Sequence, residues 1–331
     1  MARRRQRRVP PPLLGLAFGV VLLATIEAGC RAAGVREAYR IEELGQWRFV
    51  AGLQAKSFRG PRDGHSFVVS SNVDGLRTKL KRERTPGVRR VAVMGDSTVF
   101  GWGVNDGESL ADGMQSVLDP GQFEVLNAGQ PGYSTTMASW LFGEVVAEYQ
   151  PDLTVVFVPL HDTNRVLVSD AEVLHGGDGA VSSVRVWLAR ESRCYQLLRS
   201  FVFEQTDRAF LLPNEATDEP RVPRVSDEER SRALDEMVTR AATFNGKIAV
   251  GYLPFLADIE FHGSGERETE PWLRDYTASR GLGFVDVRTC CPGSAEMVLP
   301  DDPGHLSAAG NHRAGASIAE QLVSLVAKSS P

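Results

Sequence analysis

A serine and a histidine–aspartate pair are the residues of this chain best suited to nucleophilic catalysis. Ser97 follows the apolar run Val91–Met94 in "VAVMGDSTVFGWGV", where a strand ending at a tight turn can hold its hydroxyl above a sheet edge. Asp302 and His305 lie three residues apart in "LPDDPGHLSAAGN", near the far end of the chain. Serine is a weak nucleophile until a base takes its proton and hydrogen-bond donors stabilise the oxyanion. The spacing lets Asp302 orient His305, whose Nε2 is then left for a serine.

Alternating strands and helices from Arg90 onward supply the frame that would bring these residues together. Apolar runs predict strands at Val91–Met94, Phe123–Leu126, Leu153–Leu160, Ile248–Leu253 and Gly283–Val287. Helical patterns cover Ser134–Tyr149, Ser226–Phe244, Pro271–Arg280 and Ser307–Lys328. This alternation favours an α/β fold in which helices cover both faces of a five-stranded parallel sheet. Its site is expected at the carboxyl ends of the strands.

The chain is expected to form one large domain with additions. Residues 31–89 are interpreted as a connector and N-terminal flank, and residues 90–331 as the α/β domain. The stretch from about 165 to 225, between the third and fourth strands, is unusually long and is interpreted as an insertion that could shape a substrate pocket.

The first 30 residues have the pattern of a signal peptide or a signal anchor. "MARRRQRR" carries five arginines and no acidic residue, and residues 13–26 are uncharged and mostly apolar. The arginines would stay in the cytoplasm, which places the rest of the chain outside it. We expect a retained anchor ahead of cleavage, or of lipidation at Cys30. Cys194 could pair with Cys290 or Cys291, or these thiols could be free.

Three sequence blocks resemble the SGNH (GDSL-like) hydrolase superfamily. They are "GDS" at Gly95–Ser97, "NAGQPGYS" at Asn127–Ser134 and "DPGH" at Asp302–His305. Further segments resemble its membrane-anchored bacterial members: "NVDGLRTK", "FGWGV", "QPDLTVVFV" and the E-x-x-x-R of Glu27–Arg31. Each block alone is a weak signal, but three in order with the expected strands are a strong one.

The resemblance implies a flavodoxin-like three-layer fold and assigns roles to individual residues. Ser97 would be the nucleophile, His305 the base and Asp302 its orienting acid. The backbone N–H of Ser97 and Gly132 would donate to the oxyanion. This chemistry needs no cofactor and no metal, and no residue spacing in the chain resembles a metal site.

One block departs from the family pattern. The family has Gly-x-Asn-Asp after the third strand, with the asparagine as the remaining oxyanion donor, whereas this chain reads "PLHDTN" over residues 159–164. His161 takes the asparagine's place by register, and a histidine can donate a hydrogen bond. Asn164 could instead reach the oxyanion from three residues later. In a third interpretation His161 only ends the strand and the site has decayed.

Together these features predict an exported serine esterase or deacylase, tethered to the membrane, that acts through an acyl-serine intermediate. Its substrate would be O-acyl groups on envelope polysaccharide, or a lipid ester. Two alternatives are an O-acyltransferase with the same site and a non-catalytic protein that binds polysaccharide in the same cleft. The net charge of −5 argues against nucleic acid as a partner. The oligomeric state cannot be predicted from the sequence.

Overall fold

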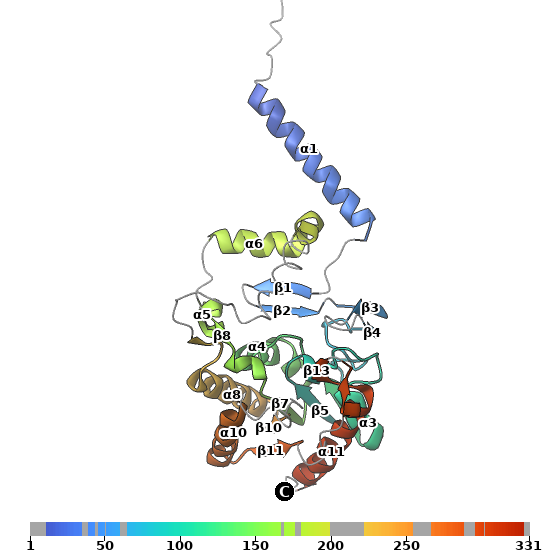
Figure 1. Ribbon diagram of the computed structural model, residues 1–331, viewed down its shortest axis with the longest axis vertical. Coiled ribbons are helices and arrows are strands. Elements are labelled where there is room, and N and C mark those ends of the chain that lie inside the picture. The colour runs from blue at the N-terminus through green and yellow to red at the C-terminus, as the bar shows by residue number, and fades with distance from the viewer. Residues whose placement is uncertain are drawn as a thin grey trace, which may run out of the picture. The chain divides into compact units, whose positions relative to one another are not determined.

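The computed structural model describes residues 11–34, 39–43, 46–49, 51–59, 65–166, 169–175, 180–198, 222–253, 266–287, 295–300 and 302–327. The chain divides into two compact units. The smaller consists of Met1–Trp47 with Gly177–Asp218, and the larger of Arg48–Gly176 with Glu219–Pro331. All five predicted strands and all candidate site residues belong to the larger unit. Figure 1 shows the elements of the chain, coloured by residue number.

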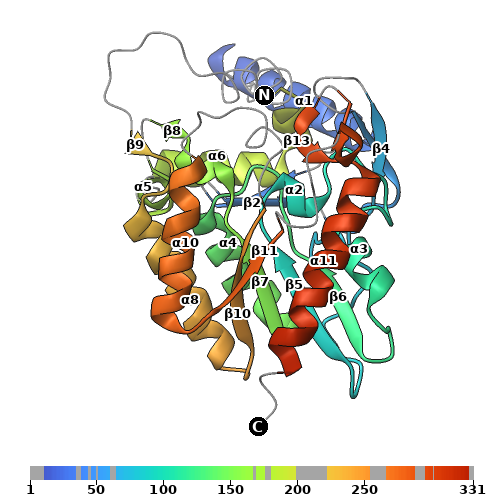
Figure 2. The same ribbon diagram turned by 60° about the horizontal axis from the view of Figure 1, so that its bottom comes forward.

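A five-stranded parallel sheet forms the centre of the larger unit (Figure 2). Its strands are β5 (Arg89–Met94), β6 (Phe123–Asn127), β7 (Leu153–Phe157), β10 (Lys247–Tyr252) and β11 (Gly283–Asp286). Their spatial order is β11-β10-β7-β5-β6, and every neighbouring pair is parallel. Counted along the chain from the β6 edge, this is the 2-1-3-4-5 order of flavodoxin-like folds. The fold predicted from the sequence is confirmed.

Helices cover both faces of this sheet and complete three layers. On one face α3 (Leu110–Val117) packs against α11 (Ala308–Ala327), and on the other lie α4 (Thr135–Glu144), α8 (Asp227–Ala242) and α10 (Glu266–Arg280) (Figure 2). The core beneath α3 and α11 joins strand residues to both helices, and its members include Val91, Val93, Val155, Leu110, Met114, Ile318 and Leu322. Apolar burial on both sides explains why the strands read as nearly continuous apolar runs.

The remaining elements are short. In chain order they are β1 (Tyr39–Glu43), β2 (Gln46–Phe49), β3 (Lys56–Arg59), β4 (Ser66–Val69), α2 (Ser97–Phe100), η1 (Val146–Tyr149), η2 (Leu160–Thr163), β8 (Arg165–Val166), α5 (Asp170–His175), β9 (Val222–Pro223), η3 (Ala295–Met297), β12 (Val298–Leu299) and β13 (Asp302–Leu306). The third sheet strand ends at Phe157, earlier than its sequence predicts, because residues 160–163 turn into η2. The helix predicted over Ser134–Tyr149 is divided into α4 and η1.

The smaller unit contains α1 (Pro11–Ala32) and α6 (Ala180–Glu191). Glu27 and Arg31 of α1 form an ion pair that hydrogen-bonds to the backbone where α6 ends. Residues 193–198 resume a helix after Ser192. The Glu27 carboxylate accepts hydrogen bonds from the N–H groups of Arg193 and Cys194 at 3.0 and 2.9 Å. Arg31 donates to Glu27 at 2.8 Å and to the carbonyl of Glu191 at 2.7 Å. The anionic Glu27 thus lies at the start of the helix over 193–198, and the cationic Arg31 lies at the end of α6. Helix dipoles favour both arrangements.

Cys30 and Cys194 are both free thiols, and Cys290 and Cys291 lie outside the described residues. Within the described ranges, no helix is long and apolar enough to meet the requirements of a membrane span.

Candidate active site

The candidate nucleophile Ser97 occupies the first turn of α2, directly after β5. Asp96 is extended, and its side chain accepts a hydrogen bond from the Thr98 N–H at 2.9 Å, which starts the helix. A Cβ on Gly95 would lie 2.6 Å from Cγ2 of Val99, so the turn packs closely against the strand. Asp96 therefore braces the turn, and Ser97 is only 9% exposed.

His305 reaches Ser97 from a hairpin formed by β12 and β13. Its Nε2 lies 2.8 Å from Ser97 Oγ, and its Nδ1 lies 2.8 Å from Oδ2 of Asp302. A carboxylate only accepts hydrogen bonds, so Nδ1 carries a proton and Nε2 can take the proton of the serine. Ser307 Oγ accepts from the Gly310 N–H at 3.1 Å and so caps α11, which anchors this hairpin. The structure thus joins all three predicted catalytic side chains.

The Asn127–Ser134 loop packs against the turn that carries Ser97. Asn127 accepts from the Gly129 N–H at 3.0 Å and donates to the Phe100 carbonyl at 3.3 Å. A Cβ on Gly129 would lie 2.3 Å from the Phe100 nitrogen, so no larger residue fits without a shift. Gly132 has a φ of +76°, which favours glycine. Within the described part of the chain, the N–H groups of Ser97 and Gly132 donate no hydrogen bond and can serve an oxyanion.

His161 and Asn164 stand together at the end of the third strand. His161 Nε2 lies 3.8 Å from Oδ2 of Asp96, the residue before the nucleophile, and the His161 side chain is 29% exposed. Its Nδ1 lies 3.4 Å from Nδ2 of Asn164. Because an amide nitrogen only donates, this contact places the imidazole proton on Nε2, on the side of Asp96. One edge of the His161 ring therefore faces the serine turn, and Asn164 contacts the other edge and orients the ring.

The comparisons with known proteins identify the family. The model of the GDSL-like Lipase/Acylhydrolase family matches residues 93–313, more than half of the chain, and this range contains Ser97, Asp302 and His305. The chain belongs to this family. The comparison with curated proteins gives no significant match.

Solved structures to which this chain is similar include several esterases. The lipase/acylhydrolase from Enterococcus faecalis is 15% identical, with a TM-score of 0.45, and the match covers 72% of this chain and 97% of that one. For the psychrotrophic esterase EstA from Pseudoalteromonas sp. the identity is 10%, the TM-score 0.45 and the coverage 72% and 99%. An acetyl xylan esterase is 14% identical, with a TM-score of 0.45, and the match covers 72% of this chain and 99% of that one. Membership of the GDSL-like family supports carboxylic-ester hydrolysis as the general activity.

A buried ion pair connects two blocks of this GDSL-like hydrolase. Asp162, fully buried, accepts hydrogen bonds from the N–H and hydroxyl of Thr135 at 2.9 and 2.6 Å and from Nε of Arg230 at 3.0 Å. Burial raises the pKa of the Asp162 carboxyl, although Arg230 and Thr135 stabilise its charged form. Asp162 thus fixes the residue next to His161 against the start of α4. The sequence did not single out Arg230, which lies 68 residues away.

The N-terminal flank also supports the site, which sequence reasoning missed. Arg77, whose side chain is 4% exposed, donates to the carbonyls of Phe100, Gly101 and Val104 at 3.1, 2.6 and 2.8 Å. These carbonyls follow the nucleophile directly. Gln130 joins the same flank to the oxyanion loop, because it accepts from the Phe49 N–H at 3.2 Å. The only sequence signal was Arg77 within "NVDGLRTK", which resembles the membrane-anchored members.

Trp102, the tryptophan of "FGWGV", has a structural role. Trp102 packs edge-on against Phe67, with ring centroids 5.0 Å apart, in an aromatic cluster after the nucleophile. His65 and His312 are exposed, whereas His262 and the side chain of His175 lie outside the described residues. In the ranges that the structure describes, no group of three His, Cys, Asp or Glu side chains could hold a metal ion.

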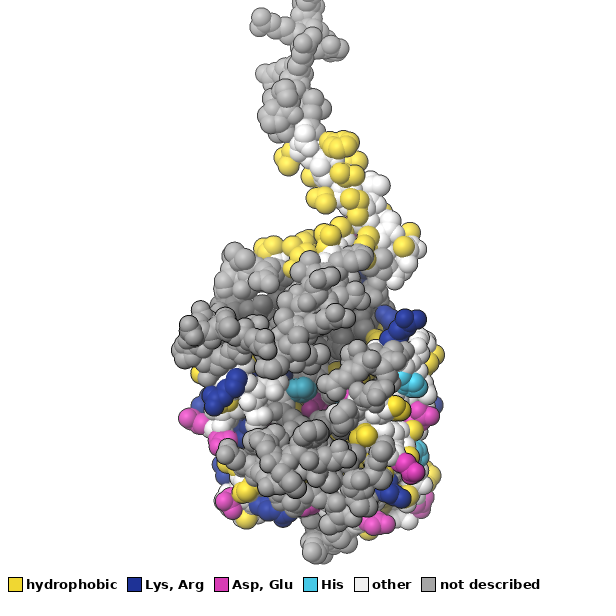
Figure 3. Space-filling model, in the orientation of Figure 1, with side chains coloured by type: hydrophobic (Ala, Val, Ile, Leu, Met, Phe, Trp, Pro, Cys, Tyr) yellow, Lys and Arg dark blue, Asp and Glu magenta, His cyan; other side chains and the backbone are white. Residues whose placement is uncertain are grey.

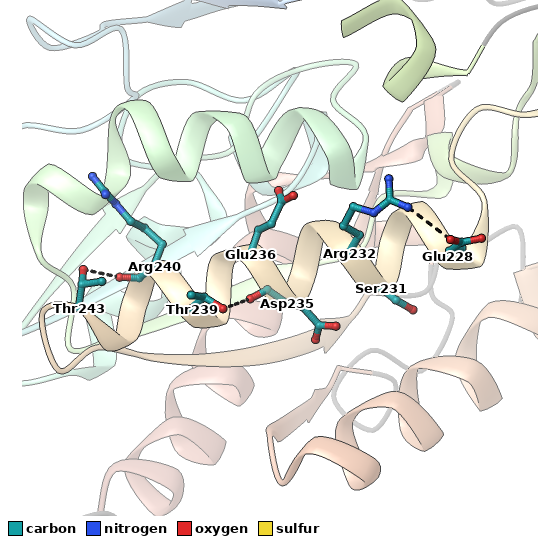
Figure 4. A pocket seen from close by; sticks show the side chains of 8 residues that line it. All are labelled: Glu228, Ser231, Arg232, Asp235, Glu236, Thr239, Arg240 and Thr243. Carbon is teal, nitrogen blue, oxygen red and sulfur yellow. Dashed lines mark hydrogen bonds and ion pairs between the residues drawn. The ribbon is translucent and has the colours of Figure 1, made fainter. Parts of the chain in front are cut away.

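A shallow hollow elsewhere in the larger unit has no part in this site. It follows the solvent-facing side of α8 and is lined by Glu228, Ser231, Arg232, Asp235, Glu236, Thr239, Arg240 and Thr243 (Figure 4). All but Thr243, which directly follows the helix, come from α8, and Arg232 pairs with Glu228 at 3.3 Å. This is an ordinary solvated helix face, and it contains none of the residues around Ser97.

Substitutions of His161 test whether it is the oxyanion donor. His161→Ala should lower kcat about 10²–10³-fold with little change in KM, because the hydrogen bond is made in the transition state. His161→Asn restores the family's residue and should retain much of the activity. Steady-state kinetics with a small activated ester measures both.

Asn164 provides the comparison. If Asn164 orients His161, Asn164→Ala should have a smaller effect than His161→Ala. If Asn164 is itself the donor, Asn164→Ala should be the damaging change and His161→Ala nearly silent. Full kcat in both alanine variants would show that neither residue serves the oxyanion.

Proposed function

We propose that the protein is a serine esterase that acts through an acyl-serine intermediate. The observation that carries the proposal is the continuous chain of hydrogen bonds from Asp302 through His305 to Ser97 Oγ, each 2.8 Å long. Ser97 Oγ attacks the ester carbonyl carbon while His305 Nε2 takes its proton. The resulting oxyanion is held by the N–H groups of Ser97 and Gly132 and by His161.

The remaining steps return the enzyme to its starting state. The ester C–O bond breaks, and His305 gives its proton to the departing alkoxide, which leaves as an alcohol. Water then attacks the acyl-serine with His305 as base, and the acid is released. Asp302 stays charged and stabilises the imidazolium.

The proposed substrates are O-acyl groups on envelope polysaccharide, with lipid esters as the second class. Hydrolysis of p-nitrophenyl acetate, with and without a fluorophosphonate, tests the reaction class. A serine esterase should lose its activity as the reagent phosphonylates Ser97, which mass spectrometry of the labelled peptide would locate. A hydrolytic rate that the reagent does not change would contradict the proposal.

The proposal includes attachment to a membrane through a retained α1. Hydrophobic side chains gather along α1 (Figure 3), and Leu16, Phe18 and Leu23 are 67%, 70% and 61% exposed. An exposed apolar surface of this kind is typical of a segment with a partner or a lipid environment. Cleavage before Cys30 would also remove Glu27 and leave the N–H groups of Arg193 and Cys194 without their acceptor.

Fractionation of bacterial cells that express the full chain tests this location. We expect the protein to sediment with membranes, to resist a carbonate wash and to contain residues 13–30 when peptides are mapped by mass spectrometry. Release by carbonate, or a mature chain that begins at or after Cys30, would contradict retention of the anchor.

A further inference from the structure

Asp170 and Arg224 form an ion pair at the base of the insertion, outside the three sequence blocks that resemble the family. Asp170 opens α5, and Arg224 follows β9. Nε of Arg224 lies 3.0 Å from both carboxylate oxygens of Asp170. The Asp170 N–H also donates to the Arg224 carbonyl at 3.0 Å. The side chains of Arg224 and Asp170 are 14% and 17% exposed, so the pair is better shielded from water than an ordinary surface salt bridge.

This pair holds the loop that carries one candidate oxyanion donor. Arg224 Nη1 donates to the carbonyl of Gly132 at 2.9 Å. Asp170 accepts a hydrogen bond from Ser134 Oγ at 2.5 Å, and the fully buried Ser134 also caps α4 by accepting from the Met137 N–H. The guanidinium is planar and its donors point in fixed directions, so it sets the orientation of the Gly132 peptide rather than only attracting it.

The backbone of the same segment holds the block that carries the other candidate donor. The Arg224 N–H donates to the carbonyl of Asn164 at 2.7 Å, and the Val225 N–H donates to the carbonyl of Asp162 at 3.0 Å. These two carbonyls flank the end of η2, on which His161 lies. Arg224 therefore contacts both segments that, with Ser97, surround the expected oxyanion.

We propose that Arg224, held by Asp170, is a positioning residue that sets the oxyanion donors of Gly132 and His161 relative to Ser97. The inference rests on the proposed esterase function. If the salt bridge only closed the base of the insertion, Arg224 would not need to bind the Gly132 carbonyl. Nor would Asp170 need to accept a hydrogen bond from Ser134. The role follows from geometry: a displacement of a catalytic group by about 1 Å can cost about 10²-fold in rate.

Kinetics per active site provide the first test. In Arg224→Met, kcat should fall about 10–100-fold while KM changes little, because the misplaced donors act in the transition state. Arg224→Lys keeps the charge but not the planar donors, and should fall between Arg224→Met and wild type. Asp170→Asn should change kcat in the same direction. Arg232→Met, on the exposed face of α8, is the matched control and should match wild type.

Titration of active sites with the fluorophosphonate separates a slower enzyme from a smaller folded fraction. A purely structural role would lower the titrated fraction and leave kcat per titrated site unchanged. A kcat per site in Arg224→Met within twofold of wild type would therefore overturn the proposal.

Hydrogen exchange provides a second test that does not depend on catalysis. Amides of residues 127–137 should exchange faster in Arg224→Met than in wild type, while those of β7 at residues 153–157 should not change. Equal exchange over 127–137 in the two proteins would overturn the proposal. If the wild type hydrolysed no ester, the proposed function would fail, and the exchange result would still decide whether Arg224 positions the loop.

Discussion

Replacing Ser97 with alanine should abolish ester hydrolysis, with kcat reduced about 10⁶-fold towards the rate of the uncatalysed reaction. The variant removes the Oγ that His305 Nε2 contacts at 2.8 Å, so no acyl-enzyme can form. Any residual rate would come from the oxyanion donors and substrate binding alone. Initial rates with p-nitrophenyl acetate measure the change after the spontaneous rate is subtracted.

Two further observations make this result specific. Ser97→Ala should no longer bind the fluorophosphonate, whereas Ser231→Ala, on the exposed face of α8, should keep both activity and labelling. The thermal unfolding midpoint should change little, because the turn is held by Asp96 and Thr98 rather than by the Ser97 hydroxyl. Equal rates for wild type and Ser97→Ala would end the esterase proposal.

The fold could be predicted because burial on both faces leaves a simple pattern in the strands. Apolar runs such as Val91–Met94 have only one structural explanation in a chain where helical patterns alternate with them. The order of the strands then follows from the resemblance to a flavodoxin-like family, not from the runs themselves. The sequence gives no direct measure of which strands are neighbours.

One sheet-covering helix, α3, was not predicted, and its packing explains why. Gly113 lowers the helix propensity of this short segment, but a Cβ there would lie 2.6 Å from the Asn311 carbonyl oxygen of α11. The glycine allows the two helices to approach closely, a benefit that local propensity does not include. The capping box of Ser109 and Asp112 was a visible signal for the start of this helix.

The candidate site was predictable where its chemistry depends on short spacings. Asp302 and His305 are three residues apart, and Ser97 follows a strand, so both signals are local. The supporting arginines are different: Arg77 and Arg224 donate to backbone carbonyls, which every residue has. Because any residue can supply the accepting carbonyl, the residue types and their spacing in the sequence cannot reveal such a hydrogen bond. Likewise, the sequence indicates an insertion at about 165–225 but does not reveal that Arg224, near its end, contacts Gly132.

Replacing Asp302 with asparagine should lower kcat about 10⁴-fold while the site keeps its shape. Oδ2 of Asp302 accepts the Nδ1 proton of His305 at 2.8 Å, and this bond leaves Nε2 free to act as base. An asparagine amide can donate to Nδ1 instead, which moves the imidazole proton to Nε2. In that tautomer His305 donates to Ser97 and cannot take its proton.

The comparison with an exposed aspartate separates this effect from a general loss of charge. Asp119→Asn, in the turn before β6 at the opposite end of the sheet, should retain wild-type kcat. Asp302→Asn should also react slowly with the fluorophosphonate, since phosphonylation needs the same activated serine, and its KM should stay close to wild type. If Asp302→Asn kept kcat within tenfold of wild type, His305 would not depend on Asp302 for its tautomer. Another group would then have to fix the base, and the assignment of Asp302 as its orienting acid would be wrong.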